Sequence, residues 1–131
     1  MSITFTEQDQ LTLRTAAWGA VFLMSAAGSA HKAATEGSIA LTSATGSIGH
    51  VLAKAPKGVK YGRTVAALAD QVLPALTASM TLLEQHDPAE ADNFHRTVHV
   101  AVEAATRPQH GTPSPTMTEM ARKITEALDA A

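Results

Sequence analysis

Two histidines, His95 and His99, stand one helical turn apart in the segment DNFHRTVHVAVE, between Asp92 and Glu103. Because residues three and four positions apart share a helix face, this spacing places two imidazoles and two carboxylates along one side of a helix. A His-x3-His pair can chelate a divalent metal ion, and carboxylates can supply further ligands. His95 and His99 are therefore the candidate metal ligands of this chain.

The position of this row relative to the apolar face argues against a buried metal centre. The apolar stripe of the same segment centres between Phe94, Val98 and Ala105. By the helical period, His99 lies roughly 110–150° from that centre, and His95 lies at the edge of the stripe. The row is expected to face solvent, so a surface row without bound metal is the competing interpretation. No cofactor is predicted on other grounds.

Charged residues of one sign gather in two other places. No acid occurs between Glu36 and Asp70, and this gap contains four bases: Lys54, Lys57, Lys60 and Arg63. A cluster of acids without lysine or arginine follows: Glu84, Asp87, Glu90 and Asp92. The basic loop of one subunit could therefore meet the acidic cluster of another subunit across a two-fold axis.

Composition excludes several classes of chemistry. The chain has 131 residues and no cysteine, which excludes a thiol nucleophile, a disulfide framework and cysteine-ligated zinc. A net charge of −2 argues against nucleic-acid binding, which normally needs many phosphate contacts. No Gly-x-Ser-x-Gly elbow occurs, and Gly46-Ser47-Ile48-Gly49 lacks the Lys-Ser/Thr ending of a phosphate loop. The sequence thus offers no convincing catalytic set, which favours a protein that is not an enzyme.

The longest uncharged runs do not resemble membrane spans. Thr15–Ala30 and Gly37–Ala53 are short and rich in Gly, Ser and Thr. Glu7 and Asp9 precede the first apolar run, and this sign of charge is wrong for a secretory signal. These features predict a cytoplasmic protein without membrane contact.

Apolar residues recur with helical period through most of the chain, and the pattern predicts an all-α fold. The first helix is apolar on nearly all sides from Ala16 to Ala27, which predicts a central position. A short strand at Ser38–Thr42 is the alternative in the least regular part. We expect one domain over residues 1–131, an antiparallel bundle of about five helices. Their predicted ranges are Glu7–Ala27, Ser38–Ala55, Thr64–His86, Pro88–Arg107 and Pro115 to near Ala131.

Local signals mark the helix ends. Thr6-Glu7-Gln8-Asp9 resembles a capping box, and Thr64 can cap the third helix. Asp87-Pro88-Ala89-Glu90 offers a cap, a proline at the first helical position and a glutamate that can reach back to the N–H of the cap. Pro108 is expected to stop the fourth helix, and Ser114 to cap the fifth.

Pro74 lies inside the third predicted helix. An internal proline removes a hydrogen-bond donor and crowds the carbonyl four residues earlier, at a cost of roughly 3 kcal/mol unless the helix bends. We therefore expect a kink at Pro74.

Three functions remain open on the sequence. The favoured one is a non-catalytic helical module that forms a homo-oligomer or binds a protein partner. The second is a metal-binding protein that uses His95 and His99. The third is a binder of small apolar ligands with a pocket near Trp18 and Pro74.

Overall fold

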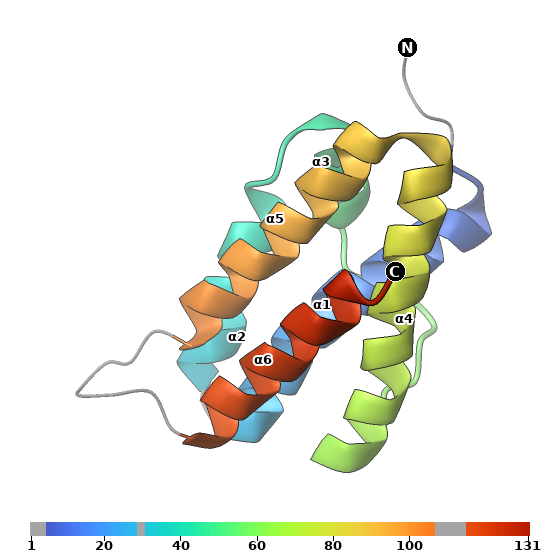
Figure 1. Cartoon of the computed structure of the whole chain (residues 1–131). Coiled ribbons are helices and arrows are strands. Elements are labelled where there is room, and N and C mark those ends of the chain that lie inside the picture. Colours follow the sequence, from blue (N-terminus) through green and yellow to red (C-terminus); the bar gives the residue numbers. More distant parts are fainter. Residues whose placement is uncertain (1–4, 29–30, 107–114) are drawn as a thin grey trace.

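The structure is a computed structural model that describes residues 5–28, 31–106 and 115–131, with the side chains of 31–34 and 36 excepted. All regular secondary structure in these ranges is helical, which confirms the all-α class. Figure 1 shows six helices, α1 (Glu7–Gly28), α2 (His31–Thr42), α3 (Gly46–Leu52), α4 (Val65–His86), α5 (Pro88–Thr106) and α6 (Pro115–Asp129).

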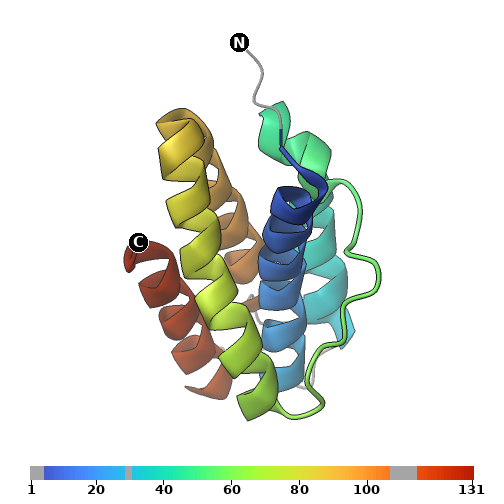
Figure 2. The same ribbon diagram turned by 90° about the vertical axis from the view of Figure 1, so that its right-hand side faces the viewer.

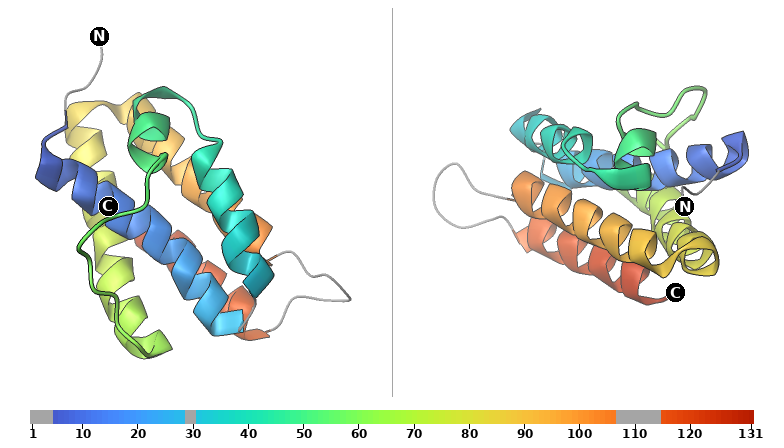
Figure 3. Two further views of the ribbon diagram at one scale, coloured as in Figure 1. Left: turned by 180° about the vertical axis from the view of Figure 1, so that it is seen from behind. Right: turned by 90° about the horizontal axis from the view of Figure 1, so that it is seen from above.

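The helices lie in two layers, which are clearest from above in the right-hand view of Figure 3. One layer holds α1, α2 and α3, and the other holds α4, α5 and α6. Helix α1 contacts every other helix. Most of its residues from Ala16 to Met24 are therefore buried. This burial agrees with the central position predicted from the sequence.

The helix predicted at Ser38–Ala55 is in fact two helices. Helix α2 already begins at His31 and ends at Thr42, and α3 begins at Gly46 after a short turn. Gly46 has a φ of 77°, a left-handed value that a right-handed helix cannot continue through and that glycine adopts without strain. The alternative of a strand at Ser38–Thr42 is wrong, because these residues belong to α2.

The core is aliphatic, with Phe94 as its fully buried aromatic side chain among the described residues. The apolar residues of α4, α5 and α6 that face this core recur at helical spacing, whereas Val65, at the start of α4, is exposed. They comprise Leu68, Val72, Leu76, Met80 and Leu83 of α4, Phe94, Val98, Ala101, Val102 and Ala105 of α5, and Met117, Met120, Ile124 and Leu128 of α6.

The predicted caps at Thr6 and Thr64 are confirmed. Asp9 donates its N–H to Thr6 Oγ1 at 3.0 Å, and Thr6 donates its own N–H to an Asp9 carboxylate oxygen at 3.2 Å. Ala67 donates its N–H to Thr64 Oγ1 at 3.0 Å. The predicted stop at Pro108 and the predicted cap at Ser114 lie outside the described residues.

Helix α4 is the one helix of the described ranges that is long and apolar enough to cross a membrane. Length and composition alone do not distinguish a membrane span from a helix packed in a core. In this structure α4 packs on α1, α5 and α6, and it continues without a break through Pro74, whose side chain is exposed.

Candidate functional site

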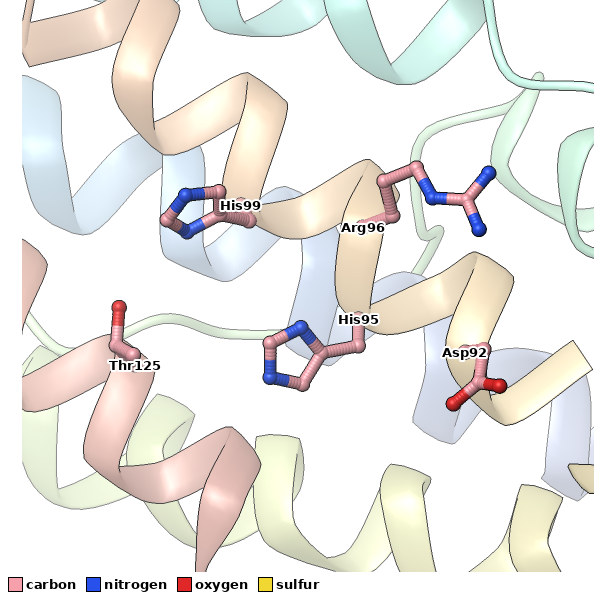
Figure 4. Close-up of a pocket in the computed structure, with 5 residues that line it drawn as sticks. All are labelled: Asp92, His95, Arg96, His99 and Thr125. Carbon is pink, nitrogen blue, oxygen red and sulfur yellow. The ribbon is translucent and has the colours of Figure 1, made fainter.

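An open groove runs between α5 and α6 and has a volume of about 400 Å³. We call it the histidine groove. Figure 4 shows both imidazoles projecting from α5 toward the helix that carries Thr125, whereas Arg96 is directed away from them. The lining residues are Asp92, His95, Arg96, His99 and Thr125.

Each imidazole of this groove has its own carboxylate. His95 Nε2 lies 2.8 Å from Asp129 Oδ1, and His99 Nε2 lies 2.8 Å from Glu103 Oε1. The side chains of His95 and His99 are 33% and 46% exposed. The two histidines thus lie at the surface, as the helical wheel predicted. Across the described residues, no three His, Asp or Glu side chains already form a metal-binding group. Metal binding by His95 and His99 therefore stays a prediction.

Asp129, which contacts His95 of this groove, was not predicted from the sequence. It stands 34 positions after His95 and reaches it only because α6 packs beside α5. No local spacing carries that information. Asp92 lines the groove but makes no ion pair with a described residue.

A second open groove, of about 560 Å³, lies between the start of α1 and the segment that follows α3. It gathers three cations, Arg14, Lys54 and Lys57, and we call it the basic groove. Its other lining residues are Glu7, Gln10, Leu11 and Ala55. The structure thus adds Arg14 to the predicted bases Lys54 and Lys57. Lys60 and Arg63 are exposed further along the same segment.

Two side chains of α1 hold the end of α3 beside the basic groove. Arg14 donates its Nε–H to the carbonyl oxygen of Val51 at 2.8 Å, and Trp18 donates its indole N–H to the carbonyl oxygen of Leu52 at 3.2 Å. These bonds satisfy carbonyls that a helix leaves open at its C-terminus. The sequence places Arg14 on the same face as Trp18, four residues later, but it does not identify α3 as their partner.

The basic segment between α3 and α4 is fastened to the helices by side chains other than its cations. Tyr61 donates its hydroxyl to the carbonyl oxygen of Thr15 at 3.0 Å. The Gln71 side chain accepts from Gly62 N–H and donates to the Lys60 carbonyl, both at 3.0 Å. Burial raises the pKa of Tyr61 to about 12. The cations thus remain exposed on an anchored backbone, which follows the outer side of α1 in Figure 2.

Two of the four acids in the predicted cluster accept hydrogen bonds from backbone N–H groups. Asp87 caps α5, because its Oδ1 accepts the Ala89 N–H at 3.0 Å. The prediction that Glu90 reaches back to the Asp87 N–H is wrong, because that N–H donates to the Leu83 carbonyl. Glu90 Oε1 instead accepts the Ser47 N–H at 3.1 Å, at the start of α3.

The other two acids, Glu84 and Asp92, are exposed and make no ion pair with a described residue. The same holds for the bases Lys54, Lys57, Lys60 and Arg63. Within the described residues, ion pairs join His95 to Asp129, His99 to Glu103, and Arg122 to Glu119 and Glu126. The opposite charges noted in the sequence are thus not paired with each other inside one molecule.

The two residues proposed to flank an apolar pocket have different environments. Trp18 is partly buried and packs against Phe22, with its N–H bonded to the Leu52 carbonyl. Pro74 is exposed on α4. Neither residue lines the histidine groove or the basic groove.

No family model, curated protein or solved structure matches this chain.

Proposed function

We propose that this protein is a non-catalytic helical module that associates with further copies of itself through charge. The basic groove of one copy receives exposed carboxylates from the α4–α5 turn region of another. One observation supports this most: opposite charges of the same chain are exposed and have no ion-pair partners within the described molecule.

The basic groove is suited to carboxylates. Arg14 is oriented by its Nε–H bond to the Val51 carbonyl, which leaves the outer nitrogens of its guanidinium without a described hydrogen-bond partner. A guanidinium presents its N–H groups in a planar fork that matches a carboxylate. Lys54 and Lys57 line the same groove and outnumber its one acid, Glu7.

Fewer acids are available for the contact than the four that the sequence suggested. Asp87 and Glu90 already accept backbone N–H groups within the fold. Glu84, near the end of α4, and Asp92, in the second turn of α5, remain exposed. We therefore assign the acidic side to Glu84 and Asp92.

The positions of the two surfaces favour head-to-tail contact over the two-fold arrangement expected from the sequence. The basic segment follows the α1–α3 layer, whereas the α4–α5 turn belongs to the opposite layer (Figures 2 and 3). Two different surfaces on different layers make a heterologous contact, which closes into a ring or continues as a chain.

Such an interface is weak and sensitive to salt. Exposed ion pairs contribute only about 0–1 kcal/mol each, and at 0.1 M salt their attraction is screened over about 10 Å. We expect a transient association that is detectable at high protein concentration and low ionic strength.

Sedimentation velocity over a range of protein and salt concentrations tests the proposal. We expect the weight-average sedimentation coefficient to rise with protein concentration at low salt and to stay at the monomer value at high salt. The double variant Lys54→Glu, Lys57→Glu should remain monomeric at low salt, whereas Lys123→Glu, an exposed lysine outside the groove, should behave as the wild type. A wild-type protein that stays monomeric at low salt contradicts the proposal.

We propose two finer features of the fold in addition, namely an antiparallel bundle of the helices and a bend of α4 at Pro74. Two observations support them. A single residue, Asp87, separates α4 from α5, so the chain must reverse sharply there. Pro74 has no N–H to donate within an otherwise continuous helix.

A further inference from the structure

The two imidazoles of the histidine groove have the sequence spacing of known helical metal chelates. His95 and His99 are four residues apart on α5, and Figure 4 shows both rings on the side that faces α6. Residues at this spacing have Cβ atoms about 5–6 Å apart, so two imidazole nitrogens can reach one ion. Metalloprotease helices use the same His-x3-His spacing to hold zinc.

A carboxylate from a different helix lies within reach of this pair. Asp129, in the last turn of α6, places Oδ1 at 2.8 Å from His95 Nε2. Imidazole nitrogen and carboxylate oxygen both belong to the ligand set of zinc, with ligand distances of about 2.0–2.2 Å. Two groups bound to one ion at such distances lie close to each other, as His95 and Asp129 already do.

We propose that His95, His99 and Asp129 bind one Zn²⁺ ion per molecule and that the ion ties the end of α6 to α5. The three groups do not yet surround a single point in the described structure. To reach the ion, His99 must leave Glu103, and Asp129 must turn. All three side chains are at least one-third exposed, so these rotations displace no core atom. A fourth position is left for water, as in zinc sites with three protein ligands.

The ion affects the attachment of α6 because the existing anchors of that helix end at Leu128, one residue before Asp129. Met117, Met120, Ile124 and Leu128 are buried, and Thr77 donates its hydroxyl to the Ala127 carbonyl at 2.6 Å. Asp129 and the residues after it are exposed. A zinc link adds to these anchors a constraint at Asp129, whose side chain otherwise contacts His95.

Calorimetric titration of the full chain with ZnCl2, in a buffer that does not bind zinc, tests the site. The wild type should bind one equivalent of Zn²⁺ saturably. The substitutions His95→Ala, His99→Ala and Asp129→Asn each remove one ligand and should weaken binding by about tenfold or more. Loss of a group that only orients a metal ligand already costs about tenfold in metal affinity. His86→Ala, which removes an exposed histidine outside the groove, should leave binding unchanged.

Amide hydrogen exchange provides a second measurement. Zn²⁺ binding to a histidine elsewhere in the chain would leave the exchange rates of α6 unchanged. Zn²⁺ should slow amide exchange in the last turn of α6 in the wild type and in His86→Ala, but not in Asp129→Asn. Absence of saturable Zn²⁺ binding, or binding that survives His99→Ala undiminished, would overturn the site. Undiminished binding by Asp129→Asn, or unchanged exchange in α6, would overturn the link between the helices.

Discussion

Glu90 is a side chain of α5 that holds the start of a different helix. The residue before α3, Thr45, makes no side-chain cap, and Glu90 Oε1 takes its place by accepting the Ser47 N–H at 3.1 Å. Glu90 Oε2 also accepts from Asn93 Nδ2, which in turn donates to the Thr45 carbonyl. The turn between α2 and α3 is thus fastened to α5 by two polar side chains.

We predict that Glu90→Ala lowers the free energy of unfolding by about 1 kcal/mol, the usual cost of losing a helix cap. Glu90→Gln should lose less, because its amide oxygen can still accept the Ser47 N–H. Chemical denaturation followed by the fluorescence of Trp18, the only tryptophan, measures both effects. Glu84→Ala is the control and should stay within about 0.5 kcal/mol, since its exposed carboxylate makes no ion pair with a described residue. Equal stabilities of Glu90→Ala and Glu84→Ala would contradict the capping role.

Tyr61 provides a prediction about pH, because burial raises its pKa from 10.0 to about 12. The unfolded chain releases this proton at the lower pH, so the folded state retains one more proton between the two values. Stability should therefore be unaffected by this group below pH 10 and should fall as the pH rises from 10 toward 12. The fall should be shallower in Tyr61→Phe.

Ultraviolet absorbance of tyrosinate measures the ionisation directly, because Tyr61 is the only tyrosine of the chain. The folded protein should titrate near 12, and protein unfolded in denaturant should titrate near 10.0. Titration of the folded protein at the value of the unfolded chain would show that Tyr61 is not buried against α1.

At the scale of helices, local patterns in the sequence correctly predicted the features that depend only on residues of the same helix. The core faces of α4, α5 and α6 follow from apolar spacing, and the caps at Thr6 and Thr64 follow from hydroxyls near a helix start. The break between α2 and α3 was missed, although Gly46 lies there, because a glycine is equally compatible with close helix packing. Gly37 does have that packing role, since a Cβ there would lie 2.8 Å from Val21 Cγ1 of α1.

Contacts between helices were beyond the reach of the sequence. The bonds of Arg14 to Val51, Glu90 to Ser47 and His95 to Asp129 join residues 34 to 43 positions apart. Each depends on which helices become neighbours, and apolar spacing does not encode that order. The predicted basic and histidine residues were therefore correctly placed at the surface, whereas Arg14 and Asp129 emerged only from the fold.

Pro74 gives a prediction for α4. In a helix interior proline is about 3 kcal/mol less favourable than alanine, and Pro74 is exposed, so its removal loses little buried surface. We expect Pro74→Ala to raise the free energy of unfolding by up to about 3 kcal/mol, with the upper limit set by that propensity difference. Thermal denaturation measures the change, and Ala78→Pro, one turn later on the same exposed face, should destabilise the protein. A loss of stability in Pro74→Ala would instead mean that the packing of α4 requires the proline bend.

At the scale of the whole molecule, the predicted basic segment and the exposed acids Glu84 and Asp92 lie on different layers. The basic segment crosses α1 in the left-hand view of Figure 3. The exposed acids Glu84 and Asp92 belong to α4 and α5. A net charge of −2 conceals this separation, because it sums over surfaces that never meet in one molecule. In the proposed self-association, these charges are paired between molecules.

A charge-swap mixture tests the central claim of self-association most directly. The variant Lys54→Glu, Lys57→Glu carries acids on both surfaces, and the variant Glu84→Lys, Asp92→Lys carries bases on both. Each variant alone should sediment as a monomer at low salt because like charges repel, whereas an equimolar mixture should associate at least as strongly as the wild type. Variants that each associate like the wild type, or a mixture that remains monomeric, would contradict the account.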